Sequence, residues 1–185
     1  MKLKDAVPVG LNLISGEGNL QTHFIKWRFC GSIRRQKEEV FDIDIVAIEK
    51  HDYSIGEPTL DDNIKKLDPR GFEESKKLGK SGVQRFSLGE SIKRFRYKDI
   101  IIDIYLADEK TYETLILIRT GSKEHNIRLT TLARGKGLKL FAGGQGLCKI
   151  HMEKNKEVID KIVDNTEDGI LLQLLGKIPK PEERD

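Results

Sequence analysis

The sequence contains few of the residues on which small cross-linked scaffolds and zinc sites depend. Its two cysteines, Cys30 and Cys148, are too few for a disulfide framework, and neither belongs to a CxxC motif. The four histidines are scattered and include no pair at the spacing of metal ligands. No apolar run approaches the ~18–20 residues that a membrane-spanning helix needs. The composition therefore argues against a disulfide scaffold, a zinc site and a membrane protein.

What is present fits a globular chain. Apolar residues make up 37% of the 185 residues, and 17 glycines bring the total into the ordinary globular range. Residues 1–5 lack the apolar core of a signal peptide, so secretion is not expected. The default location is the cytoplasm, or the nucleus or virion for a eukaryotic or viral source.

The net charge of +3 conceals an uneven distribution. Residues 65–98 hold eleven basic and four acidic residues, and residues 119–139 hold six basic residues and one acidic residue. Such runs are either a solvated surface or a face that follows nucleic-acid phosphates. On the second interpretation, the predicted DNA-binding residues are Lys93, Arg94, Arg96, Arg128, Arg134, Lys136 and Lys139.

Alternating apolar residues predict most of the strands in the first part of the chain. The expected strands are residues 24–29, 41–48, 83–88, 91–97 and 100–106. A short helix is expected over 3–15 and another over 59–67, with Thr59 as its N-cap. Residues 67–82, which contain proline and glycines, are expected to form a loop with at most one helical turn.

The second part of the chain reads as mainly helical. A helix is expected from Asp108 to Ile118, and a second from its N-cap Ser122 to about Gly135. A hairpin is expected from segments 138–141 and 147–150, followed by helices over 158–163 and 167–175. Strands followed by helices predict an α+β fold with a mixed sheet.

Three aspartates form a candidate metal site. Asp42 and Asp44 lie two apart on a predicted strand, so their side chains leave the same face. Asp103 interrupts an apolar strand, where a carboxylate is costly unless it is paired or bound to a cation. Carboxylates that converge from neighbouring strands suit two Mg²⁺ ions, with Mn²⁺ as a substitute, and such a pair supports phosphoryl transfer. The competing explanation is a common Asp-x-Asp sequence and a buried aspartate that caps a loop.

The segment before the first two aspartates has the composition of a phosphate site. Gly31 allows the backbone to approach a phosphate, Ser32 offers a hydroxyl and an N–H group, and Arg35 adds a forked donor. A simple turn would explain Gly31 and Ser32 alone. Together with the aspartates, this segment predicts nucleotidyl transfer.

Residues 31–44, with the sequence GSIRRQKEEVFDID, resemble the signature of the family X DNA polymerases within the nucleotidyltransferase superfamily. The strand around Asp103 is similar to their third metal-ligand strand. Residues 120–126, TGSKEHN, are similar to the segment where the palm meets the nucleotide-binding subdomain. Segments 166–176 and 181–185 resemble the C-terminal close of the family.

The resemblance implies a role for each matching residue. Asp42 and Asp44 would bind both metal ions, and Asp103 would bind the catalytic ion and accept the proton of the primer 3′-hydroxyl. Ser32 and Arg35 would hold the incoming triphosphate. The residues implied to bind the nucleotide are Gly31, Ser32, Arg35, Gly121, Ser122, Lys123 and Asn126.

The resemblance also predicts two domains, a nucleotidyltransferase palm over 1–118 and a small α/β, thumb-like subdomain over 119–185 that binds nucleotide and DNA. Several positions depart from the family pattern. Gln36 and Phe41 stand where the family has glycine, and Ile118-Arg119 stands in place of an aromatic pair that helps to exclude ribonucleotides.

The function predicted from these features is a DNA polymerase that fills short gaps in repair. It would act as a monomer on DNA and dNTPs with two Mg²⁺ ions. One alternative is a template-independent nucleotidyltransferase with a nucleic-acid or small-molecule acceptor. A catalytically silent nucleic-acid-binding module is the other, although the presence of all three carboxylates argues against it.

Overall fold

The computed structural model describes residues 1–52, 54, 56–78 and 86–185. Two compact units divide the chain, Met1–Leu106 and Ala107–Asp185. The predicted boundary after residue 118 falls inside helix α5 (Tyr112–Thr120), whereas the whole of this helix belongs to the second unit. The reason is packing: α5 contacts α7 (Glu167–Leu175), and the Thr114 hydroxyl donates to the Asn165 carbonyl at 2.9 Å.

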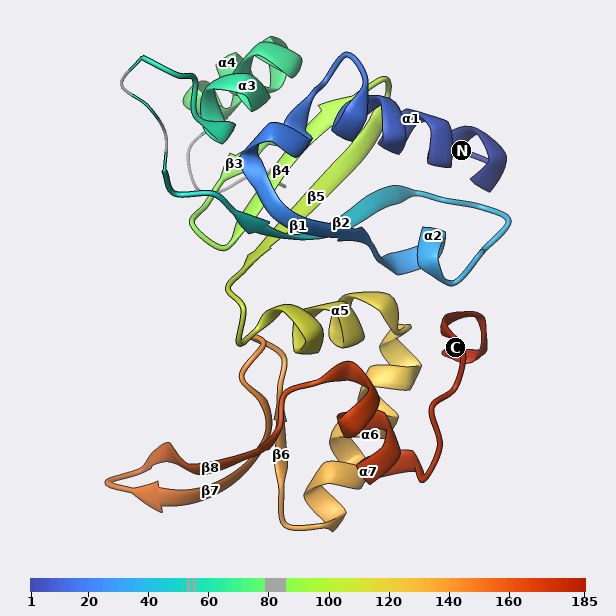
Figure 1. Cartoon of the computed structure of the whole chain (residues 1–185), viewed down its shortest axis with the longest axis vertical. Coiled ribbons are helices and arrows are strands. Elements are labelled where there is room, and N and C mark those ends of the chain that lie inside the picture. Colours follow the sequence, from blue (N-terminus) through green and yellow to red (C-terminus); the bar gives the residue numbers. More distant parts are fainter. Residues whose placement is uncertain (53, 55, 79–85) are drawn as a thin grey trace. The chain divides into compact units, whose positions relative to one another are not determined.

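The first unit is built on a five-stranded sheet in the order β1-β2-β5-β4-β3. The strands are β1 (Phe24–Phe29), β2 (Asp42–Glu49), β3 (Ser87–Leu88), β4 (Ile92–Tyr97) and β5 (Ile100–Ala107). Figure 1 shows helices α1 (Leu3–Ser15), α3 (Leu60–Leu67) and α4 (Pro69–Leu78) gathered along one side of this sheet. The order makes β5 a central strand beside β2, as the sequence predicts.

Alternation gives this sheet two different faces. On β2, Ile43, Ile45 and Ala47 are buried in the hydrophobic core with residues of α1 and α3. Ile102 and Ile104 do the same on β5. Because side chains alternate along a strand, the residues between them leave the opposite face of the sheet. That second face carries the aspartates.

Local capping explains where α3 begins. The Thr59 hydroxyl accepts the Asp62 backbone N–H at 3.2 Å, and the Asp62 carboxylate accepts the Thr59 backbone N–H at 3.2 Å. This capping box satisfies two N–H groups that a helix start leaves unpaired, and it confirms the predicted N-cap.

The loop predicted over 67–82 is wrong for much of its length, because α4 occupies Pro69–Leu78. Proline is compatible with the first helical position, where its missing N–H costs nothing. The Asp68 carboxylate accepts the Gly71 N–H at 2.9 Å and so caps the same turn. Part of the strand predicted over 83–88 lies outside the described residues, and the described part contains β3.

The second unit combines α5, α6 (Lys123–Gly135) and α7 with a three-stranded sheet in the order β6-β7-β8. The strands are β6 (Lys139–Phe141), β7 (Gly146–Glu153) and β8 (Lys156–Asp164). The helix predicted over 158–163 is therefore wrong. Lys154 and Asn155 both have positive φ angles, 47° and 64°, and form the two-residue turn that pairs β8 with β7.

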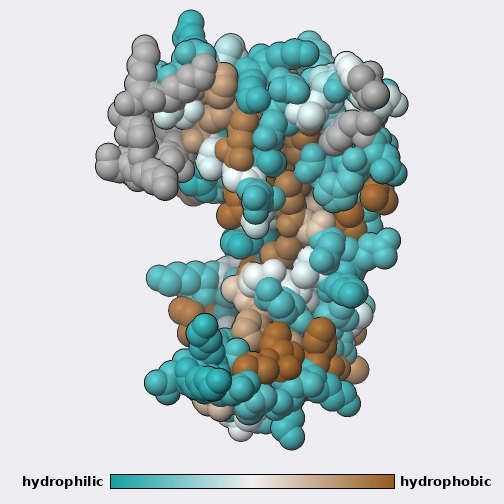
Figure 2. Space-filling model, turned by 90° about the vertical axis from the view of Figure 1, so that its left-hand side faces the viewer, coloured by the Kyte–Doolittle hydropathy of each residue, from teal (hydrophilic) through white to brown (hydrophobic). Residues whose placement is uncertain are grey.

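Apolar side chains reach the surface of this second unit, as Figure 2 shows. On the β7–β8 hairpin the exposed large apolar residues are Met152, Ile159 and Ile162. Taken together, the two units confirm the expected α+β class with a mixed sheet. Within the described part of the chain, no helix has both the length and the apolar character needed to cross a bilayer.

Candidate active site

Strand β2 carries two of the predicted carboxylates on the sheet face opposite the core. Asp42 and Asp44 are half-buried and alternate with the buried Ile43 and Ile45. The Asp44 carbonyl accepts the Cys30 N–H at 2.8 Å, which ties the segment after β1 to β2. The sequence therefore positions both aspartates through strand alternation and one backbone hydrogen bond.

Asp103 lies on the neighbouring strand β5 and is 1% exposed. Arg94 is its direct cross-strand partner on β4. Arg94 Nε donates to Asp103 Oδ1 at 2.6 Å, and a terminal guanidinium nitrogen donates to Oδ2 at 2.5 Å. The buried carboxylate is thus paired through both of its oxygens, which removes most of the cost of burying it.

The electrostatics connect the carboxylates of the two strands. Burial raises the pKa of Asp42 above its ordinary value, and the negative charge of Asp103 raises it further. The positive charges of Arg94 and Arg35 oppose this rise in the pKa of Asp42. The hydrogen bond to Asp103 in turn raises the pKa of Arg94. Two carboxylates that repel each other in this way favour a cation between them.

The Gly31–Ser32 segment forms the edge of the same site. Gly31 opens the short helix α2 (Gly31–Arg34) with a φ of 54°, and a Cβ there would overlap the Asp44 carboxylate. The Ser32 hydroxyl is buried and makes no hydrogen bond with the described residues. A buried hydroxyl without a partner, beside a turn that needs glycine, is what a bound phosphate would complete.

The donor set therefore has the chemistry of a divalent-cation site. Carboxylate oxygens are the ligands that Mg²⁺ and Mn²⁺ prefer. Among the described residues, no three histidine, cysteine or acidic side chains are arranged to hold one ion. The Asp103 carboxylate is bound to Arg94, so the three aspartates lie on neighbouring strands without forming a complete set of ligands around one ion.

The second unit contains the other predicted nucleotide-binding residues. Ser122 caps α6 by accepting the His125 N–H at 3.0 Å, and Lys123 is exposed in the first turn. Asn126 donates to the Ile118 carbonyl at 2.8 Å, while its buried Oδ1 has no hydrogen-bond partner in the described chain. A Cβ at Gly121 would lie 2.7 Å from that Oδ1. Gly121, Ser122, Lys123 and Asn126 thus form one group within this unit.

Comparison with known proteins bears on this arrangement. No family model matches the chain. The protein described as DNA polymerase/3′-5′ exonuclease PolX from Bacillus subtilis (strain 168) is 31% identical over 124 residues. Over this region the chain is similar to a family X DNA polymerase. The aligned region covers 66% of this chain and 19% of that protein, so the chain spans about a fifth of the length of its curated relative.

The fold of the chain agrees with that similarity. Polymerase beta of Leishmania infantum, solved as a ternary P/T complex, matches with a TM-score of 0.67 and 21% identity. The match covers 100% of this chain and 76% of that chain. The resemblance inferred from the motifs and the α+β class are both confirmed.

The predicted DNA-binding cations of the chain differ in how accessible they are. Lys93 is buried and pairs with Asp61 at 2.8 Å, and the partly exposed Arg94 is bound to Asp103, so both side chains are already paired with carboxylates of the first unit. Lys139 pairs with Glu157. The predicted cations that remain exposed lie on or just after α6, and they are Arg128, Arg134 and Lys136.

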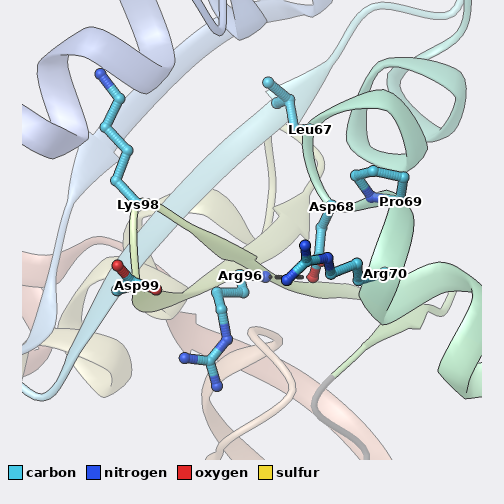
Figure 3. A pocket seen from close by; sticks show the side chains of 7 residues that line it. All are labelled: Leu67, Asp68, Pro69, Arg70, Arg96, Lys98 and Asp99. Atoms are coloured by element: carbon cyan, nitrogen blue, oxygen red, sulfur yellow. Dashed lines mark hydrogen bonds between the residues drawn. The ribbon is translucent and has the colours of Figure 1, made fainter.

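Arg96, the remaining cation predicted on β4, lines a cavity of about 260 Å³ that also contains Arg70 and Lys98 (Figure 3). The Asp68 carboxylate accepts the Arg96 backbone N–H at 2.8 Å and so joins the start of α4 to β4. Figure 3 shows the Lys98 ammonium pointing away from the two guanidinium groups. That Arg70 and Lys98 line the same cavity as Arg96 was not predicted from the sequence. The many basic residues over 65–98 could have indicated it.

Proposed function

We propose that the chain transfers a nucleotidyl group from a dNTP to the 3′-hydroxyl of a DNA primer under the direction of a template, in short-gap repair. The observation that carries this proposal is the placement of Asp42 and Asp44 on β2 next to the strand β5 that holds Asp103, together with a Gly31–Ser32 turn whose buried hydroxyl has no hydrogen-bond partner among the described residues. The relationship to family X polymerases supports it.

Each residue has a task in this reaction. The 3′-oxygen attacks the α-phosphorus, a new P–O bond forms, and the bond to the leaving pyrophosphate breaks. Asp103 accepts the proton that the 3′-hydroxyl loses. Ser32 and Arg35 hold the triphosphate, and Asn126 and Gly121 contact the base and the sugar.

Two Mg²⁺ ions would be held by Asp42, Asp44 and Asp103. Such ions, when bound, activate the attacking oxygen and neutralise the leaving group. The donors fit them because every oxygen belongs to a carboxylate and because Asp42 and Asp103 repel each other without a cation.

The test is primer extension with and without template, using deoxy- and ribonucleotides. Asp103→Asn is expected to abolish incorporation while DNA binding, measured separately, is retained. Asp160→Asn, which removes an exposed carboxylate of β8, is the matched control and should extend primers normally. Incorporation that ignores the template base would favour the template-independent alternative, and full activity of Asp103→Asn would refute the mechanism.

A further inference from the structure

Arg94 occupies an unusual position between the surface and the candidate metal site. Its side chain is 40% exposed, whereas the Asp103 side chain that it holds is 2% exposed. A side chain that is partly in contact with water is therefore bound to a buried carboxylate. It can withdraw toward solvent without unpacking the hydrophobic core, because Phe95 and Tyr97, the core residues of β4, point to the other face of the sheet.

The contact uses both oxygens of Asp103, one from Nε and one from a terminal nitrogen. Asp42 contributes its negative charge to the same guanidinium. The positive group thus lies where two of the three proposed metal ligands concentrate negative charge. An ion bound to Asp103 would need the same oxygens and would face the same positive charge at short range.

On the basis of the proposed function, we propose that Arg94 is a positioning residue that holds Asp103 in the metal-free protein and is displaced when a divalent ion binds. The partial exposure of the Arg94 side chain leaves solvent into which it can move. While Arg94 holds Asp103, the fraction of molecules able to bind metal is lowered, and the apparent metal affinity falls by that fraction. On this proposal, Arg94 does not contact a DNA phosphate. The prediction from charge alone places it among the DNA-binding residues.

The experiment measures binding of Mn²⁺ to the full chain without DNA or nucleotide, by the loss of the free-ion signal in electron paramagnetic resonance. Arg94→Gln removes the competing charge and should bind Mn²⁺ about tenfold more tightly than the unmodified chain. Arg96→Gln is the matched control, because it removes one arginine two residues further along β4 without touching Asp103. It should bind Mn²⁺ with unchanged affinity.

Arg94→Gln leaves Asp103 buried without its partner, so this variant should be less stable. A second measurement, of melting temperature, therefore tests stability with and without metal. The melting temperature of Arg94→Gln without metal should fall below that of the unmodified chain, and Mn²⁺ should raise it by a larger increment. Adding Asp103→Asn to Arg94→Gln should abolish both the gain in affinity and this larger increment.

The outcomes separate this inference from the function on which it rests. Equal or weaker Mn²⁺ binding by Arg94→Gln, with metal binding intact in the unmodified chain, overturns the role of Arg94 and leaves the two-metal proposal standing. If neither protein binds Mn²⁺, the two-metal proposal fails, and this inference fails with it.

Discussion

Gly31 gives the sharpest test of how the turn and the carboxylates depend on each other. Its φ of 54° lies in the left-handed region, and a Cβ at this position would overlap the Asp44 carboxylate. Gly31→Ala therefore imposes two separate costs. The first is backbone strain, about 1–2 kcal/mol for a residue with a side chain. The second is displacement of Asp44, and overpacking of this kind typically costs about 1–3 kcal/mol.

Gly56 separates the two costs. It also has a positive φ, 92°, and lies in the same unit, but no atom of the described residues lies within 4 Å of a Cβ built there. Gly56→Ala should destabilise the first unit by about 1–2 kcal/mol, and Gly31→Ala by ~2–5 kcal/mol. Urea denaturation followed by the fluorescence of Trp27, the single tryptophan, reports on this unit.

Activity provides the second readout. A carboxylate displaced by about 1 Å can cost a hundredfold in rate, so Gly31→Ala should extend primers at about one hundredth of the normal rate. Gly56→Ala should extend them normally. Equal stability and equal activity of the two variants would refute the claim that Gly31 is required to make room for Asp44.

Two further predictions concern stability. Burial lowers the pKa of His23, so the folded chain takes up a proton on this imidazole less readily than the unfolded chain does. Stability of the first unit should therefore decline as pH falls below about 6.5, where the unfolded chain takes up the proton, and His23→Gln should flatten that decline in urea titrations at pH 5–7. Arg184 is 2% exposed and donates to Glu167 at 2.5 Å, so Arg184→Met should cost the second unit about 3–5 kcal/mol, measured by hydrogen exchange in α7, whereas Lys139→Met at a more exposed pair should cost less than about 1 kcal/mol. The same decline of stability with falling pH in His23→Gln and in the unmodified chain would contradict the role of His23. Equal losses of stability in the two methionine variants would contradict the role of Arg184.

Several features could be predicted from the sequence because they depend on neighbours in the chain. The strand over 24–29 is found with the same bounds, and Thr59 and Ser122 cap the helices expected of them. Alternation also places Asp42 and Asp44 on one face of a strand. The local pattern gave wrong predictions for two elements. Pro69 predicts the end of helical structure, although proline at the first position of α4 is compatible with a helix. For β8, the turn at Lys154–Asn155 pairs the segment with β7 as a strand.

The candidate site shows the same division. The residues proposed to carry the chemistry could be predicted from the sequence, because the aspartates, the glycine and the serine are recognisable by type and spacing. Which basic side chains can contact DNA depends on the tertiary structure. A run of basic residues has the same composition whether its side chains contact phosphates or protein carboxylates. Pairing of β4 with β5 commits Arg94 to Asp103, and packing of α3 commits Lys93 to Asp61. Arg94 meets Asp103 across a hairpin, and Lys93 meets Asp61 from a separate helix, so the pairing of strands and the packing of helices, rather than local preference, assign each charge its role.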